Sequence, residues 1–185
     1  MMRRVVITGV GAVTPIGNTV KEMWAGVREG KCGIDKITKY DISNRKVKVA
    51  AEVKNLPVEE LVDKHDLRKM DLFCTFAMIA ADEAIADSGL SFEGEEDKCG
   101  VIVSSGIGGI STIEKEYSKG LEKGFDRVSP YFIPSVITNM AAGRIAIKHN
   151  LQGMCSCVVT ACAGGTNAVG DSFRQIRDGY ADVMV

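Results

Sequence analysis

The sequence predicts an α/β fold in which helices cover a parallel, buried sheet. Three segments contain, in the same order, a strand rich in β-branched residues, a glycine-rich turn and a helix, and repeated units of this kind produce parallel strands. The chain has 185 residues, of which 45% are hydrophobic and 25% are charged. A domain of this size and composition buries a core without disulfide bonds or a structural metal.

Charge and cysteine usage exclude several classes of protein. The 23 Lys and Arg residues nearly balance the 24 Asp and Glu residues, and no basic stretch would follow a phosphate backbone, so we expect no nucleic-acid partner. The six cysteines form no C-x-x-C pair, which predicts reduced thiols and no metal site. Gly9 and Gly11 interrupt the first apolar run, and no apolar stretch is long enough for a membrane span. We therefore expect a soluble, cytoplasmic protein.

The first part of the chain is predicted to contain a strand, a helix and a second strand. The first strand covers Arg4–Thr8, whose β-branched residues suit a buried position. The helix begins after Thr19, because Thr19 and Glu22 form a capping box, and it ends at Gly30. Apolar and charged residues alternate over Val47–Val53, which predicts a half-exposed strand.

A long helix is predicted from about Lys64 to Ser88, and Gly89 is expected to end it. Much of its apolar face consists of alanine, at positions 77, 80, 81 and 84. Small side chains let other segments approach a helix closely. We therefore expect this helix to lie in the centre of the fold rather than on its surface.

Two further strand–turn–helix units and a last strand complete the prediction. The strands are Cys99–Ser104, Met154–Thr160 and Ala181–Val185, the turns are Gly106–Gly109 and Ala161–Gly165, and the helices are Ile110–Lys123 and Thr166–Arg177. The chain ends inside the last, apolar strand with no helix after it. We therefore expect one domain, 1–185, that is truncated before further sequence.

The glycine-rich turns do not match nucleotide-binding motifs. Gly9 and Gly11 follow a predicted strand, but the third glycine and the distant acidic residue of a dinucleotide site are missing. The turn at Gly106–Gly109 lacks the Lys and Ser or Thr of a P-loop. We expect these glycines to shape a pocket wall.

Cys162 is the strongest candidate for a catalytic residue. It lies between a predicted strand and a predicted helix, and its neighbours Ala161, Ala163 and Gly164 are all small. A sharp strand-to-helix turn suits a nucleophile, because the reacting carbonyl must approach closely. A helix N-terminus favours a thiolate and offers backbone N–H groups to an oxyanion, although its dipole alone activates a thiol only partly. The alternative is an inert core thiol.

A cysteine nucleophile also needs a basic partner, and the chain contains only two histidines. His65 belongs to a charged cluster near the start of the predicted long helix. His149 lies in the polar stretch Lys148–Asn150, which predicts a solvated loop. Spacing along the chain does not assign either histidine to Cys162.

Six motifs occur in order along the chain: Val5–Gly11 (VVITGVG), Thr14–Asn18 (TPIGN), Ser105–Gly109 (SGIGG), Ser129–Ser135 (SPYFIPS), Asn139–Met140 and Val159–Gly165 (VTACAGG). Each is weak by itself. Together they resemble the N-terminal half of a β-ketoacyl-acyl carrier protein synthase, and the type II, elongating enzyme is the most similar. The resemblance implies a thiolase-like layered αβαβα fold, of which this chain contains the first half only.

The resemblance implies an acyltransferase of fatty acid biosynthesis. Cys162 would accept an acyl group from acyl carrier protein, and the carbanion formed by decarboxylation of a malonyl carrier thioester would attack the Cys162 thioester to give a 3-oxoacyl carrier thioester. No cofactor is expected on the protein itself, since phosphopantetheine arrives on the carrier. The family's catalytic histidines, a lysine and a glycine–phenylalanine loop come from the second half, so we expect this chain alone to be catalytically incomplete.

The resemblance also assigns two residues to the acyl pocket. Ile107 resembles a residue whose bulk bounds the family's acyl tunnel; the alternative is an ordinary turn residue that covers the core. Phe132 resembles an aromatic residue that reaches the pocket of the twofold mate, which implies a homodimer.

A basic patch is expected to bind the carrier protein, whose surface is acidic in this family. Its members are Lys64, Arg68, Lys69 and Arg127. Cations near the start of a helix oppose its dipole, so we expect the first three to serve something other than helix stability. The alternative is a solvated face whose charge is offset by Asp63, Asp66 and Asp71.

Two other functions stay open at this point. A polyketide-type ketosynthase would also have this fold, although a run of serines after the cysteine would favour it and the chain has Ala163–Gly165 instead. A half-domain that only folds or dimerises would do no chemistry. The reactivity of the Cys162 thiol separates this last possibility from the two enzymes.

Overall fold

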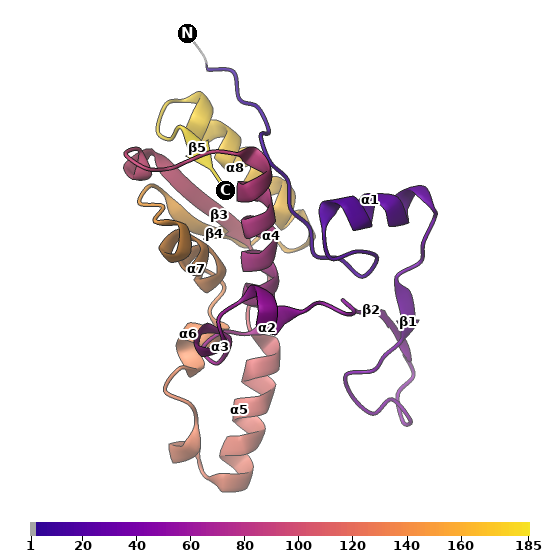
Figure 1. Cartoon of the computed structure of the whole chain (residues 1–185). Helices are drawn as coiled ribbons and strands as arrows, with labels where there is room; N and C mark the ends of the chain where they lie inside the picture. The colour runs from indigo at the N-terminus through magenta and orange to yellow at the C-terminus, as the bar shows by residue number, and fades with distance from the viewer. Residues whose placement is uncertain (1–2) are drawn as a thin grey trace.

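The computed structural model describes residues 3–185, and a parallel sheet forms its centre (Figure 1). The strand order is β4 (Cys155–Val158), β3 (Cys99–Ser104) and β5 (Val183–Met184). The predicted parallel sheet is confirmed, and β3 has the predicted bounds. The two outer strands are shorter than predicted.

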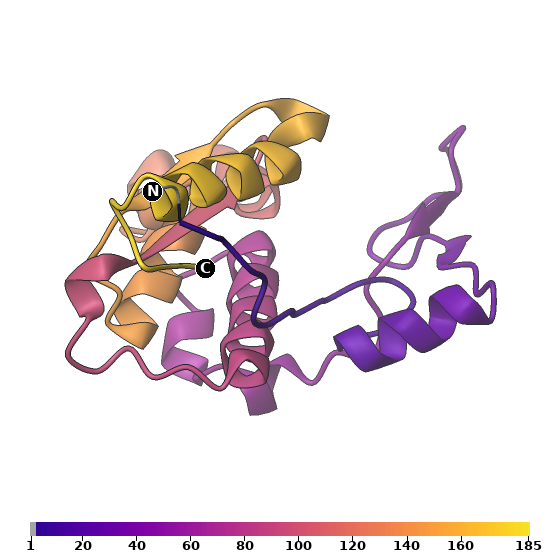
Figure 2. The ribbon, with the colours of Figure 1, turned by 90° about the horizontal axis from the view of Figure 1, so that it is seen from above.

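Helices cover both faces of this sheet. Successive residues of a strand point to opposite faces. Val101 on β3 is buried in a cluster with α4 (Leu72–Ser88) and α7 (Met140–His149), whereas Ile102 faces α8 (Gly164–Arg177). Figure 2 shows α8 on one side of the sheet and α4 with α7 on the other. The core therefore lies between β3, α4 and α7.

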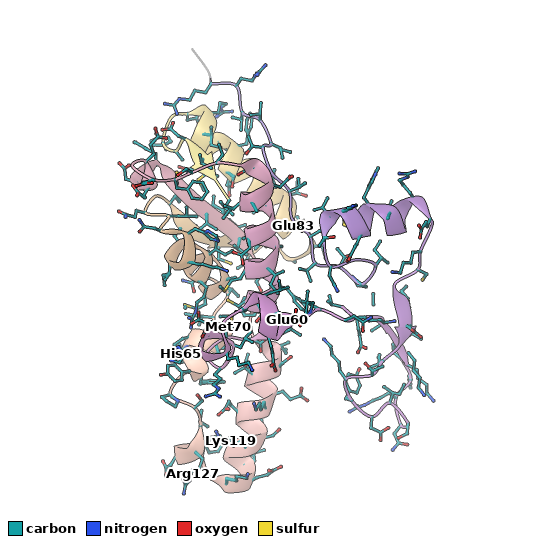
Figure 3. The ribbon with its side chains drawn as sticks, viewed as in Figure 1. Glu60, His65, Met70, Glu83, Lys119 and Arg127 are labelled. Atoms are coloured by element: carbon teal, nitrogen blue, oxygen red, sulfur yellow. The ribbon has the colours of Figure 1, made fainter. Side chains whose placement is uncertain are left out.

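The N-terminal segment lies against α4 at two glycines. A Cβ atom at Gly9 would be 2.0 Å from a backbone oxygen of α4, and one at Gly11 would be 1.8 Å from another. The backbone N–H groups of Ala12 and Val20 donate to the carboxylate of Glu83 on α4, at 2.8 and 2.9 Å (Figure 3). The prediction that small residues place this helix in the centre of the fold is confirmed.

The predicted strand at Arg4–Thr8 is wrong. Within residues 3–185 this extended segment pairs with no strand. Ile7 is 83% exposed. The segment borders a cleft of 580 Å³ with α8 and the chain beyond β5. Its β-branched residues indicate extended backbone, but a strand also needs hydrogen bonds to a neighbouring strand.

Residues 20–51 form a side lobe beside α4 (Figure 1). It contains α1 (Val20–Arg28) and an antiparallel pair, β1 (Ile34–Lys36) and β2 (Val49–Ala51). The predicted helix is confirmed, since the Thr19 side chain accepts from the backbone N–H of Glu22 at 3.2 Å. The half-exposed strand is confirmed over the three residues of β2. The apolar face of α1 stays open, with Trp24 59% exposed.

The single helix predicted from Lys64 to Ser88 is instead two helices. These are α3 (Lys64–Leu67) and α4, and residues 68–71 separate them. Asp71 has extended backbone and its side chain caps the start of α4, so a helix cannot continue through it. The predicted end is confirmed, because Gly89 caps α4 with a left-handed φ of +63°.

The bounds of the remaining helices were predicted only in part. α5 (Ile110–Lys123) has its predicted bounds, and α8 begins two residues earlier than predicted. Three helices were not predicted from the sequence, namely α2 (Val58–Leu61), α6 (Phe132–Val136) and α7. Short 3₁₀ turns cover Glu96–Lys98, Phe125–Arg127 and Ala161–Ala163. In the part of the chain that the structure describes, no helix combines the length and apolarity needed to cross a membrane.

Candidate active site

Two loops meet at one edge of the sheet. β3 and β4 are parallel neighbours, and their last residues, Ser104 and Val158, are paired. The loop after β3 contains Ile107, and the turn after β4 contains Cys162. Ligands of open α/β sheets bind beyond the carboxyl ends of the strands, where such loops lie. The structure therefore brings two of the predicted site residues to the edge where a ligand site is expected.

The turn that carries Cys162 is sharp and open. Ala161, Cys162 and Ala163 form a 3₁₀ turn directly before α8, and all three are exposed. Ala161 has a φ of +47°, a region that residues with a side chain rarely adopt. Strained backbone of this kind concentrates at functional sites. The predicted small-residue turn is present, with the thiol at the N-terminal end of a 14-residue helix.

Gly164 is the residue that lets this helix start so close to the sheet. A Cβ atom at Gly164 would be 1.8 Å from the Ser104 hydroxyl oxygen at the end of β3. Gly165, in contrast, faces open space. The first of the two glycines therefore permits close packing of α8 on β3, and the second leaves room beside Cys162.

The six thiols differ in exposure and in acidity. Cys74 and Cys99 are buried, and desolvation raises the pKa of Cys74 to about 11 and also raises that of Cys99. Desolvation raises the pKa of Cys155 as well, although this residue reaches the surface. The other exposed cysteines are Cys32, in the side lobe, and Cys162. Cys162 is thus an exposed thiol, and the interpretation of it as a core residue is wrong.

The loop that carries Ile107 is fixed at its C-terminal end. Gly108 has a φ of +78°, and a Cβ atom there would be 2.0 Å from the backbone oxygen of Val136 on α6. The N–H of Gly109 donates to that same oxygen at 3.0 Å. Ile107 itself is 62% exposed, so it does not cover the core. α6 begins at the half-buried Phe132. The hydrogen bond from Gly109 to Val136 therefore links the loop of Ile107 to the helix of Phe132, the two residues predicted to lie in the acyl pocket.

The basic residues lie at both ends of α3, with Lys64 as its first residue and Arg68 and Lys69 after its last. Arg68 is the C-cap of α3 and is exposed, and Lys69 follows it. The expectation that these cations oppose a helix dipole is therefore wrong for Arg68 and Lys69, because the predicted long helix is broken here. Lys64 lies 3.5 Å from Glu59. The Lys69 ammonium lies 5.2 Å from the centre of the Tyr131 ring, beside Phe132.

The three aspartates expected to offset this patch face other groups. Asp63 accepts from the backbone N–H of His65, Asp66 lies 3.3 Å from Arg144, and Asp71 is buried. Arg127 belongs to the turn below α5, and Figure 3 shows it at the lower end of that helix, away from His65. The positive charge of Arg68, Lys69 and Arg127 is therefore not matched by an ion pair within residues 3–185.

A buried carboxylate holds the chain between Arg127 and Phe132. Glu116 on α5 accepts from the backbone N–H of Ser129 at 2.7 Å and from Lys119 at 3.2 Å. The Ser129 hydrogen bond lowers the pKa of Glu116 most, and Lys119 lowers it further against the opposing effect of desolvation. This role of Glu116 was not predicted, because one Glu on an amphipathic helix carries no signal of burial.

The two histidines are placed away from Cys162. His149 is the last residue of α7, and its Nε2 lies 2.8 Å from a carboxylate oxygen of Asp82 on α4. The predicted solvated loop is thus wrong, because Asn150 caps a helix that was not anticipated. His65 lies on α3, with its Nδ1 3.3 Å from the Lys69 ammonium. Neither histidine hydrogen-bonds to Cys162 in the described part of the chain.

Comparison with known proteins identifies the family. The family model described as "Beta-ketoacyl synthase, N-terminal domain" matches residues 2–185. The chain belongs to this family. The ketoacyl synthase domain is 44% identical over 184 residues to 3-oxoacyl-[acyl-carrier-protein] synthase 2 from Synechocystis sp., and equally identical to the Staphylococcus aureus protein of that name. The match covers 99% of this chain and 44% of each relative, so the chain spans less than half of their length.

Solved structures agree with this assignment. The ishigamide ketosynthase/chain length factor is 28% identical and has a TM-score of 0.87 over 100% of this chain and 46% of its own. A beta-ketoacyl synthase from Burkholderia phymatum is 24% identical, with a TM-score of 0.83 over 97% of this chain and 45% of its own. The predicted thiolase-like α/β fold is confirmed.

Proposed function

We propose that this ketoacyl synthase domain carries the nucleophile of a fatty acid acyltransferase that makes 3-oxoacyl-acyl carrier protein. The observation that supports this proposal is the exposed thiol of Cys162, which lies in a strained turn at the start of α8. The 44% identity to two 3-oxoacyl-[acyl-carrier-protein] synthases 2 supports the choice of substrate class.

The reaction has two chemical stages. In the first, the Cys162 thiolate attacks the acyl thioester carbon, a new S–C bond forms, and the carrier's thiolate leaves and takes up a proton. In the second, the malonyl carrier thioester loses CO₂, and the resulting carbanion attacks the Cys162 thioester and releases the thiolate. The backbone N–H of Cys162, at the N-terminal end of α8, is the proposed first oxyanion donor in both stages.

Neither histidine in residues 3–185 is placed to act as the base in these stages. His149 is bound to Asp82 and His65 lies beside Lys69, so neither is assigned to proton transfer. We assign the base and the second oxyanion donor to groups beyond residues 3–185, in agreement with the family resemblance.

The proposed carrier-binding surface consists of Lys64, Arg68, Lys69 and Arg127. Arg68 and Arg127 are exposed, and the aspartates nearest to α3 are occupied by other partners. A ketosynthase of the same fold, from a type II polyketide synthase, has been solved in complex with its acyl-carrier protein, which makes a carrier complex reasonable here. Phosphopantetheine would arrive on that carrier, and no cofactor is assigned to the domain.

Assembly and location complete the proposal. We propose a homodimer in the cytoplasm, to which Phe132 contributes across the twofold axis. β4 is an edge strand of the sheet, and Val159 just beyond it is 55% exposed, so apolar surface is available for a partner copy. Light scattering on the 185-residue chain tests this part: a monomer at micromolar concentration would contradict it.

Condensation is tested in a chimera in which residues 1–185 precede the part of the Synechocystis relative that this chain does not match. The chimera is supplied with acyl and malonyl carrier thioesters, and the 3-oxoacyl product is measured by mass spectrometry. We expect product from the parent and none from Cys162→Ala, while Cys32→Ala retains the parent's rate. Equal rates in the parent and Cys162→Ala would contradict the proposal.

A polyketide-type ketosynthase is the second candidate. The similarity to the ishigamide ketosynthase/chain length factor favours it, and the higher identity to two 3-oxoacyl-[acyl-carrier-protein] synthases 2 opposes it. Acceptance of the unreduced 3-oxoacyl product for a further round by the chimera would favour this second candidate, because the second half of the chimera comes from a 3-oxoacyl-[acyl-carrier-protein] synthase 2.

A further inference from the structure

One buried carboxylate caps two helices at the edge of the active site. Asp71 is 6% exposed and is the N-cap of α4. One of its oxygens faces the N–H of Phe73 in the first turn of α4, at 3.5 Å. The other accepts both the backbone N–H and the hydroxyl of Thr112, at 2.7 Å each, although Thr112 is 41 residues away in sequence.

Thr112 lies in the first turn of α5, and that helix has no cap of its own. Its N-cap is Gly109, which has no side chain to accept a hydrogen bond. The first backbone N–H groups of a helix need acceptors from outside the helix, and an anion near them is stabilised by the helix dipole. Asp71 therefore replaces the missing cap of α5 from a neighbouring helix.

This contact fixes the loop that carries Ile107. A Cβ atom at Gly109 would be 2.9 Å from the Cβ atom of Asp71, so the loop end packs directly on this side chain. On its other side, Gly109 bonds to Val136 on α6. The end of the loop is thus held between Asp71 and α6, while Ile107, two residues earlier, is exposed.

We propose that Asp71 is a positioning residue that holds Ile107 at a fixed depth in the acyl pocket and thereby sets the acyl chain length that the enzyme accepts. This inference rests on the proposed function and on the predicted acyl-pocket role of Ile107, because it needs an acyl group on Cys162 that reaches Ile107. Asp71 itself touches no substrate. It acts through Thr112 in the first turn of α5, because this helix begins at Ile110, shortly after Ile107.

The decisive variant is Asp71→Asn, which keeps the size of the side chain and replaces one acceptor oxygen by a donor. Whichever way the amide turns, its NH₂ group faces either the N–H of Phe73 or the N–H and hydroxyl of Thr112, so one cap is lost. Thr112→Val removes only the hydroxyl bond, and Thr112→Ser keeps it. The matched control is Asp87→Asn, since Asp87 lies on the same helix and accepts the backbone N–H of Val10 at 3.0 Å, far from the loop.

Hydrogen exchange of the 185-residue chain measures the loop directly. We expect the amides of residues 105–113 to exchange at least tenfold faster in Asp71→Asn and severalfold faster in Thr112→Val, with β3 and α7 unchanged. Thr112→Ser and Asp87→Asn should match the parent. An unchanged loop, or faster exchange spread evenly over β3 and α7, would overturn the positioning role. Thr112→Val decides the point by itself if Asp71→Asn does not fold.

Condensation by the chimera measures the consequence. The chimera is supplied with acyl carriers of increasing chain length, and kcat/KM is compared between the longest and the shortest acyl group. We expect this ratio to change at least threefold in Asp71→Asn, chiefly through KM. In Thr112→Ser the ratio should equal the parent's value. An unchanged ratio beside a released loop would overturn the inference. A parent chimera that does not condense refutes the proposed function instead, and the exchange experiment then still decides whether Asp71 positions the loop.

Discussion

The two loops at the edge of the sheet are built differently. The loop after β3 is anchored at Gly108 and Gly109 by α6 and by Asp71, and it presents Ile107 from a fixed base. The turn after β4 is exposed over Ala161–Ala163, and only Gly164 behind it is tightly packed, against Ser104. The loop proposed to bound the acyl pocket is therefore held by contacts within this domain, whereas the proposed nucleophile lies in an exposed turn that groups from outside can reach.

The largest effect is expected from adding a methyl group to the anchored loop. Gly108→Ala places a Cβ atom on the Val136 oxygen and forces alanine into a left-handed conformation, so we expect a loss of about 2–4 kcal/mol in the free energy of unfolding. Gly165→Ala in the cysteine turn meets open space, and we expect it to change stability by no more than about 1 kcal/mol. Urea unfolding measures both. Equal losses would show that the two loops are not packed differently.

The second effect concerns the proposed carrier-binding surface. Arg68→Glu with Lys69→Glu should weaken binding of acyl carrier protein about tenfold at low ionic strength and flatten its salt dependence, because complementary charge steers the encounter. Lys46→Glu with Lys48→Glu changes the net charge equally in the exposed side lobe and should leave binding unchanged. Titration calorimetry at two salt concentrations tests this. Equal weakening in both double variants would assign the effect to net charge.

The third effect is on acyl selectivity. Ile107→Phe in the chimera should reduce kcat/KM for long acyl carriers severalfold while sparing short ones, because a larger side chain removes pocket volume. Ile147→Phe, on the exposed surface of α7, is the control, since Ile147 is 77% exposed. A chain-length profile identical to the parent's would remove Ile107 from the pocket.

The smallest effect is a pH dependence of stability that arises from Glu116. Its pKa is lowered in the folded protein, so it adds stability that is complete above the ordinary value of about 4.3 and is lost as pH falls through the folded value. Glu116→Gln should therefore be less stable than the parent at pH 7, and the difference should shrink below pH 4. Glu114→Gln, exposed on the same helix, should show no such trend in thermal unfolding. A constant difference from pH 7 to pH 3 would contradict the account.

Features that depend on local sequence could be predicted, whereas features that depend on contacts between distant residues could not. β3, α5 and the cysteine turn were predictable, because β-branched runs, helical spacing and small residues are local signals. The break at Asp71 could have been found, since an Asp before an apolar helical run is an N-cap signal. Its second bond, to Thr112, could not, because it joins residues 41 positions apart. Whether Arg4–Thr8 pairs with another strand is also a long-range property, so its β-branched residues predict extended backbone but not a strand.

The central claim, that Cys162 is the nucleophile, is tested most directly by the order in which the six thiols react. The 185-residue chain is treated with limiting iodoacetamide at neutral pH, and the adducts are mapped by peptide mass spectrometry. Cys162 should be modified first, severalfold ahead of Cys32, because Cys162 is the exposed cysteine at a helix N-terminus, and the buried Cys74 and Cys99 should stay unmodified. Preferential modification of Cys32 or Cys99 would contradict the claim.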